Sequence, residues 1–109
     1  MNDCILVLTT MPADARADGL ARTLVDERLA ACVHVHVPMT STYRWQGAIE
    51  VESERQMVIK TKQANLSALE ARLRALHPYD VPEFVVLNGT ANDAYAAWIA
   101  ETTSSDGAR

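Results

Sequence analysis

The fold of this chain depends on the stretch Ala48–Thr61, AIEVESERQMVIKT, which runs for 14 residues without a Pro or Gly. Ser41–Gln46 (STYRWQ) precedes it as another extended stretch, and Gly47 between the two predicts the turn of a β-hairpin. The second arm exceeds the common upper limit of about 10 residues for a strand. We expect either that a bulge interrupts this arm, or that it projects and pairs with another chain.

A strand, a helix and a second strand are predicted before this hairpin. Cys4–Thr10 (CILVLTT) is a continuous apolar run, typical of a buried central strand. From Ala13 to Glu27 or Arg28, apolar residues recur at helical spacing, which predicts an amphipathic helix. Leu29–Val37 then alternates with a period of two and predicts a strand, which the following proline ends.

A helix, a strand and a last helix are predicted after the hairpin. Gln63–Leu76 carries leucines on one helical stripe, and the His-Pro pair that follows ends this helix, because a residue before proline avoids the helical region. Glu83–Leu87 (EFVVL) is typical of a strand. Asn92–Thr102 is predicted to form the last helix, capped by its first residue or by Asp93.

The resulting order, β-α-β-β-α-β followed by a helix, predicts an α+β ferredoxin-like sandwich with a long hairpin. It consists of one four-stranded antiparallel sheet with two helices on one face. We expect a single domain over residues 1–102 and a disordered polar tail over residues 103–109. Because the other sheet face has no cover from these two helices, the last helix or a neighbouring subunit must hide it, which favours a closed homo-oligomer.

Composition and charge exclude several classes of protein. The 109 residues hold 10 Lys and Arg against 14 Asp and Glu, a net charge of −4 without a basic cluster, which argues against a nucleic-acid partner. The longest uncharged apolar run, Leu29–Val37, is far shorter than the roughly 20 residues of a membrane span. The first residues do not have the pattern of a signal peptide, and Cys4 and Cys32 have no metal-type spacing, so we expect a cytoplasmic protein with free thiols.

Two rows of polar side chains could bind metal ions. His34 and His36 lie two residues apart on a predicted strand, so both could face one transition metal, or both could mark its solvent side. We favour the solvent side, because no third ligand stands at a diagnostic spacing. Glu50, Glu52 and Glu54 share one face of the long arm and could gather hard cations, although a solvated hairpin face needs the same residues.

The segment 77–83, HPYDVPE, is stiffened by two prolines. Such a connection could hold His77, Tyr79 and Glu83 in fixed directions as a binding site, with His77 as ligand or proton carrier. A rigid connector with a packed tyrosine explains the same residues equally well.

A second candidate pocket involves the hairpin itself. Tyr43, Arg44 and Trp45, with Lys60 on the other arm, could line a pocket for an anionic ligand, the cations supplying donors and the aromatic rings its walls. Packing of the two aromatic residues across a subunit boundary is the favoured alternative. We expect a binding protein rather than an enzyme, because the sequence has no phosphate loop, nucleophile elbow, CxxC pair or metalloprotease motif.

Five short motifs, in this order and spacing, resemble those of the CutA divalent-cation tolerance proteins. They are Glu27–Val33 (ERLAACV), Thr40–Gly47 (TSTYRWQG), Ile59–Thr61 (IKT), His77–Tyr79 (HPY) and Val81–Glu83 (VPE). The resemblance implies the ferredoxin-like fold, a PII-like homotrimer whose long hairpins pair between subunits, and a cytoplasmic location.

The resemblance also implies a part in the response to metal ions, with weak binding of copper or another divalent cation. In some members the copper ligands are a Cys at the end of the first strand and a His-His pair. Thr9 and Leu76 stand at the positions of that Cys and of the first His, which leaves His77 as the candidate ligand.

Two further functions remain open. One is a PII-like regulatory module that binds a small anionic ligand between subunits, with its pocket formed by Tyr43, Trp45, Lys60, His77, Tyr79 and Glu83. The other is a purely structural or interaction trimer. No organic cofactor is expected.

Overall fold

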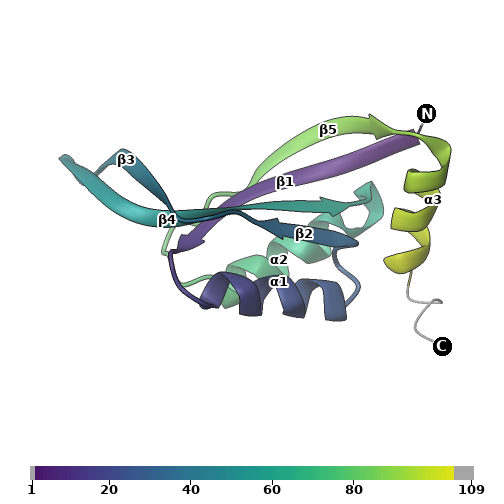
Figure 1. The fold of residues 1–109 in the computed structure, drawn as a ribbon, viewed down its shortest axis with the longest axis horizontal. Coiled ribbons are helices and arrows are strands. Elements are labelled where there is room, and N and C mark those ends of the chain that lie inside the picture. The colour runs from purple at the N-terminus through teal and green to yellow at the C-terminus, as the bar shows by residue number, and fades with distance from the viewer. Residues whose placement is uncertain (1, 105–109) are drawn as a thin grey trace.

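An antiparallel sheet carrying helices on one face is the framework of the structure (Figure 1). This computed structural model describes residues 2–104. Its elements are β1 (Asn2–Pro12), α1 (Arg16–Asp26), β2 (Cys32–Val35), β3 (Met39–Trp45), β4 (Ala48–Thr61), the 3-10 turn η1 (Gln63–Asn65), α2 (Leu66–Leu76), β5 (Val85–Ala91) and α3 (Asp93–Thr102).

The strand order β2-β4-β1-β5, with every pair antiparallel, confirms the ferredoxin-like prediction. Strand β4 pairs twice on one side: its inner part with β2 and its outer part with β3. Helices α1 and α2 cover the same face of the sheet, whereas α3 packs at the end opposite the hairpin (Figure 1). The tip formed by β3 and the start of β4 projects beyond the other strands.

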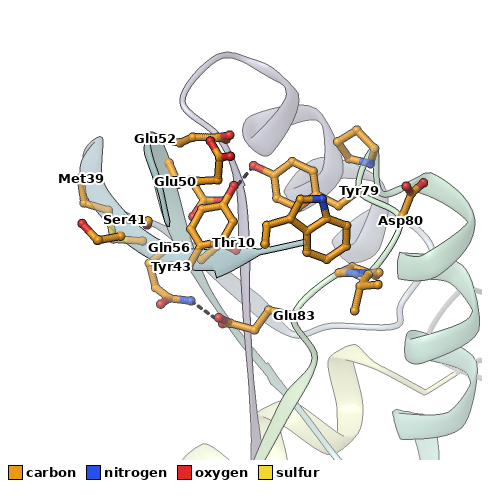
Figure 2. Close-up of a pocket in the computed structure, with 16 residues that line it drawn as sticks. Thr10, Met39, Ser41, Tyr43, Glu50, Glu52, Gln56, Tyr79, Asp80 and Glu83 are labelled. Atoms are coloured by element: carbon orange, nitrogen blue, oxygen red, sulfur yellow. Dashed lines mark hydrogen bonds between the residues drawn. The ribbon is translucent and has the colours of Figure 1, made fainter. Parts of the chain in front are cut away.

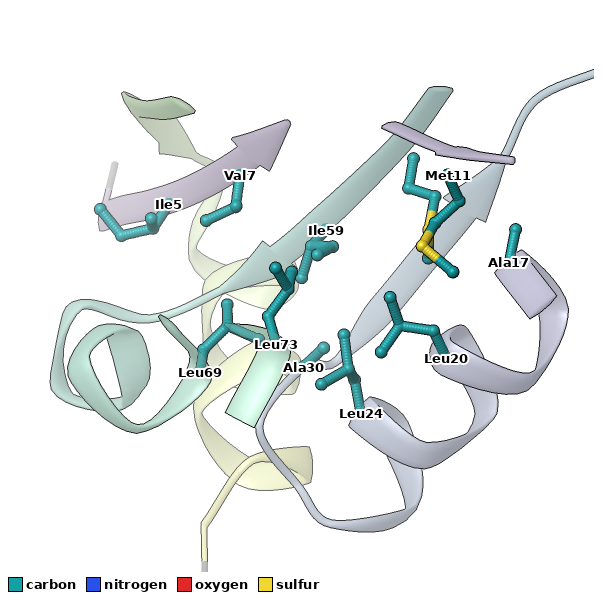
Figure 3. Packing of buried hydrophobic residues seen from close by; sticks show 11 residues of the cluster. Ile5, Val7, Met11, Ala17, Leu20, Leu24, Ala30, Ile59, Leu69 and Leu73 are labelled. Carbon is teal, nitrogen blue, oxygen red and sulfur yellow. The ribbon is translucent and has the colours of Figure 1, made fainter. Parts of the chain in front are cut away.

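The core lies between the sheet and the two helices (Figure 3). Alternate residues of β1 and β4 point into it, and α1 and α2 contribute leucines at helical spacing, as the two periodicities predict. Its fully buried large side chains include Ile5, Val7, Met11, Leu24, Met57, Ile59, Leu69 and Leu73.

The hairpin turn consists of Gln46 and Gly47, whose φ angles are 49° and 84°. Two consecutive positive φ angles characterise the two-residue turn that suits the twist of a hairpin. Strand β4 pairs in unbroken register with β3 from Ala48 to Glu54 and with β1 from Glu54 to Thr61. Of the two expected alternatives, a bulge that interrupts this arm is therefore wrong. The extra residue lies in the opposite strand, between Val35, which pairs with Met57, and Met39, which pairs with Glu54.

Several predicted strand limits differ from the structure. The first strand extends beyond Cys4–Thr10 at both ends, and the second strand is shorter than Leu29–Val37, because it runs only from Cys32 to Val35. Strand β5 begins two residues later than predicted and continues to Ala91, because Asn88 to Ala91 still pair with β1.

The polar tail does not begin at Thr103. The Thr103 side chain is buried, and its hydroxyl donates to the Ile99 carbonyl at 2.7 Å. The Thr103 carbonyl accepts a hydrogen bond from the Asn65 side-chain amide. Ser104 also belongs to the described residues, and its N–H donates to the Glu101 carbonyl at 3.3 Å. Residues 105–109 of the predicted tail lie outside the described residues.

Candidate functional site

A cleft of about 950 Å³ lies between the projecting hairpin and the segment that joins α2 to β5 (Figure 2). One wall comes from β3 and β4, and the other comes from residues 78–83. The residues that line it are Thr10, Met39, Ser41, Thr42, Tyr43, Trp45, Glu50, Glu52, Glu54, Gln56, Pro78, Tyr79, Asp80, Val81, Pro82 and Glu83.

The register of the hairpin explains its contribution to the cleft. Tyr43 pairs with Glu50, and Ser41 pairs with Glu52, so the aromatic and acidic side chains emerge on one face. The prediction that Glu50, Glu52 and Glu54 share a face is confirmed, since all three line the cleft. The alternation of the strands thus makes one face of the tip both aromatic and acidic.

Glu54 is the most buried of these carboxylates, at 7% exposed, and it accepts a hydrogen bond of 2.7 Å from the Tyr79 hydroxyl. Figure 2 draws this bond between the two walls of the cleft. Burial, followed by the hydrogen bond to the Glu54 carboxylate, raises the pKa of Tyr79 well above its usual value. Tyr79 is therefore a neutral hydrogen-bond donor at physiological pH.

A second link across the cleft runs through Gln56, whose amide donates to the Glu83 carboxylate at 3.2 Å and to the Thr9 carbonyl at 2.6 Å. Sequence reasoning missed Gln56. The signal was present, because Gln56 continues the alternation of Glu50, Glu52 and Glu54 along the same face. Tyr79 and Gln56 together fix the segment 78–83 against the hairpin.

His77 lies beneath this segment, 8% exposed, with both ring nitrogens in use. Nε2 donates to the Thr10 carbonyl at 2.8 Å, and Nδ1 accepts from the Tyr79 backbone N–H at 3.1 Å. Burial lowers the pKa of His77, although the Thr10 carbonyl and the charge of Glu54 oppose this shift. A metal ion at His77 would have to replace one of the two contacts, so its role as a ligand stays a prediction.

The charge of the cleft differs from that of the predicted anion pocket. Five of the lining residues are carboxylates, and none of the sixteen described lining residues is Lys or Arg. Tyr43, Trp45, Tyr79 and Glu83 do converge here, but Lys60 does not line the cleft. Its ammonium stands over the Tyr95 ring, 5.4 Å from the centroid.

Within residues 2–104, no group of three or more His, Cys, Asp or Glu side chains stands close enough to hold a metal ion. A cation in the cleft would therefore meet carboxylates that are not yet arranged as a coordination sphere. His34 and His36 lie outside the cleft, on β2 and just after it.

Comparison with known proteins gives a consistent family. The sequence profile described as "CutA1 divalent ion tolerance protein" matches residues 5–102. The chain belongs to the CutA1 family. It is 42% identical over 99 residues to the divalent-cation tolerance protein CutA of Thermus thermophilus. This alignment covers 90% of this chain and 96% of the relative. It is 40% identical over 97 residues to the human protein CutA, across 88% of this chain and 54% of the relative.

Solved CutA1 structures have the same fold. The CutA of Synechococcus elongatus superposes with a TM-score of 0.89 at 42% identity, over 95% of this chain and 93% of the other. The CutA of Xylella fastidiosa superposes with a TM-score of 0.88 at 40% identity, over 93% of this chain and 98% of the other.

Other CutA relatives are assigned to different compartments by name, one being chloroplastic in Arabidopsis thaliana and one periplasmic in Archaeoglobus fulgidus. In the part of this chain that the structure describes, no helix is long and apolar enough to cross a membrane.

Proposed function

We propose that this CutA1-family protein is a non-catalytic cytoplasmic homotrimer that takes part in the response to divalent metal ions. Its cleft gathers these ions weakly. The observation that carries the proposal is the lining of the cleft, which has five carboxylates without a Lys or Arg among its described residues.

The chemistry of this lining suits cations. Carboxylate oxygens are the preferred ligands of hard divalent ions, and several of them within one concave, partly desolvated surface concentrate positive charge. Glu50 and Glu52 lie beside each other on the hairpin wall in Figure 2, and Glu83 stands on the opposite wall. We infer weak binding, because Tyr79 and Gln56 already occupy oxygens of Glu54 and Glu83.

The same lining argues against a small anionic ligand in this cleft. Such a ligand would need cationic or backbone N–H donors and would meet carboxylates instead. Of the two cations expected for that role, Lys60 is directed toward Tyr95, and the Arg44 guanidinium donates to the Gly47 carbonyl at 3.5 Å. We therefore place the anion-binding alternative second.

Exposed apolar surface supports the proposed homotrimer. Ile49 and Val51, on the hairpin face that points away from the cleft, are 65% and 63% exposed. Val85 and Leu87 are also exposed and lie on the sheet face opposite α1 and α2, in line with Leu8 and Leu6 of β1. Contiguous apolar surface of this kind marks an interface in soluble proteins.

Titration with Mn²⁺, a hard divalent ion whose free form is detected by electron paramagnetic resonance, tests the cleft. Glu52→Gln, which removes one charge from the cleft, is expected to weaken Mn²⁺ binding several-fold. Glu70→Gln makes the same charge change on the exposed surface of α2 and is expected to leave binding unchanged. Equal affinities in Glu52→Gln and wild type would reject the cleft as the cation site.

A further inference from the structure

A second pocket, of about 550 Å³, lies where the ends of α1 and α3 meet, at the end of the sheet opposite the hairpin (Figure 1). Its walls come from residues 26–29 at the end of α1, from the segment that joins β4 to α2, and from residues 103–104 after α3. None of the exposed apolar side chains that the proposed homotrimer covers lines this pocket. Its volume is within the range of small-molecule sites, and the proposed subunit contacts leave it open to solvent.

Two half-buried cations line the pocket, Arg28 and Lys62, and neither has a carboxylate partner among residues 2–104. The Arg28 guanidinium donates to the Thr102 carbonyl at 3.1 Å, and the Lys62 ammonium donates to the Ala100 carbonyl at 3.3 Å. Both carbonyls belong to the last turn of α3, so the two cations meet at one place. Because a guanidinium has five N–H donors and an ammonium has three, most of their donors find no partner in the described part of the chain.

The backbone at the end of α1 explains how Arg28 reaches this place. Its φ angle is 61°, in the left-handed region where a helix commonly ends on glycine. A glycine would end α1 without a side chain, whereas the arginine extends a cationic side chain from the end of α1 to the end of α3.

The acidic side chains of the pocket do not neutralise these two cations. Glu27 accepts from the Arg72 guanidinium through both carboxylate oxygens, each at 2.8 Å. Asp26 is exposed and forms an ion pair with neither cation. Arg28, Lys62 and Arg72 against Asp26 and Glu27 give three positive charges and two negative ones. Since a partly desolvated charge is costly without a counter-charge, the pocket lacks one anionic group.

We propose that this pocket binds a small organic anion through an oxyanion group, a carboxylate or a phosphate, that accepts hydrogen bonds from Arg28 and Lys62. The guanidinium fork matches two oxygens of such a group, and the ammonium adds a point charge. Leu29 and Ala64 offer apolar surface to the rest of the molecule. This site differs from the acidic cleft in its place and in the sign of its charge, so either one can fail in experiment without the other.

The test is titration of the ¹⁵N-labelled full chain with pyrophosphate and, separately, with succinate, followed by NMR of the backbone amides at constant ionic strength. Saturable shifts are expected at Arg28 and Asn65, on two walls of the pocket. Lys62→Gln is expected to weaken binding at least about fivefold, because it removes one of the two charged donors. Asp26→Asn is expected to strengthen binding about twofold, because it removes a repelling carboxylate from the pocket.

Arg74→Gln is the matched control, since it removes an exposed cation of α2 outside the pocket and is expected to bind as wild type does. Saturable binding of either anion supports the site, and the tighter one identifies the oxyanion class. The absence of saturable shifts with both anions would overturn the proposal. An equal loss in Lys62→Gln and Arg74→Gln would overturn it as well, because binding would then follow net charge alone. If the thermal midpoint shows that Lys62→Gln unfolds, Asp26→Asn decides, and an unchanged affinity in that variant would reject the pocket.

Discussion

At the scale of single residues, the contact between Tyr79 and Glu54 joins the two walls of the cleft. A buried carboxylate is costly unless hydrogen bonds compensate for the lost water. Tyr79→Phe removes the hydroxyl and leaves Glu54 without that 2.7 Å bond. We expect the free energy of unfolding to fall by about 1–3 kcal/mol, as measured by urea denaturation.

Tyr43→Phe is the control for this experiment. Tyr43 lies on the hairpin wall of the same cleft but is 38% exposed, so water can replace the bonds of its hydroxyl. We expect a change of less than about 0.5 kcal/mol, in the usual range for an exposed position. Equal losses of stability in the two variants would mean that the hydrogen bond from Tyr79 to Glu54 stabilises the protein no more than an exposed tyrosine hydroxyl does.

The pH dependence of stability reports on His77. Because burial lowers its pKa in the folded chain, the unfolded chain binds a proton more readily as the pH falls. The stability contributed by neutral His77 is complete above the unfolded value of about 6.5 and is lost as the pH falls from there toward the folded pKa. Urea denaturation at several pH values is therefore expected to show a shallower acid-side decline in His77→Gln than in wild type. A parallel decline in both proteins would contradict this role.

The sequence predicted most of the residues that meet in the cleft but not their partners. Alternation along one strand was enough to group Glu50, Glu52 and Glu54. Lys60 was expected to join Tyr43 and Trp45 in one pocket, but it is six residues beyond Glu54, about 20 Å along an extended strand. The bond from Tyr79 to Glu54 could not be predicted, because it depends on how the segment 78–83 crosses the hairpin.

At the scale of elements, two glycines test the local conformations. Gly47 has a φ of 84°, in a region that costs other residues roughly 1–2 kcal/mol, so Gly47→Ala is expected to destabilise the hairpin. Gly19 lies inside α1, and a methyl group there would meet no other atom within 4 Å. Gly19→Ala is expected to stabilise the protein by about 0.5–1 kcal/mol. Thermal unfolding of both variants checks the opposite signs, and a stabilising Gly47→Ala would contradict the assigned turn.

The elements that local patterns specify were predicted well. The hairpin arm Ala48–Thr61 has the predicted limits, and Asn92 caps α3 by accepting from the Tyr95 N–H at 2.8 Å. The predicted strand Glu83–Leu87 ends before the observed β5 does, because Asn88 and Gly89 are poor strand formers. Pairing with β1 overrides this preference: Gly89 lies opposite Cys4, whose carbonyl oxygen would be 3.4 Å from a Cβ at that position.

At the scale of the whole molecule, the chain exposes apolar side chains, and a monomer gains no stability from exposing them. The hairpin tip and the sheet face opposite α1 and α2 carry most of them. We expect light scattering to give the mass of three 12.0 kDa chains, about 36 kDa, with or without a chelator present. Val51→Asp, which puts a charge on the exposed hairpin face, is expected to lower that mass. A mass of one chain for the wild type would contradict the proposed assembly.

The central claim is that the acidic cleft binds divalent cations, and crystals grown with Mn²⁺ test it most directly through the anomalous signal of manganese. We predict an anomalous peak between the hairpin wall and the segment 78–83, within coordination distance of Glu50 or Glu52, in every copy of the chain. Manganese bound only at other surfaces, with an empty cleft, would contradict the account.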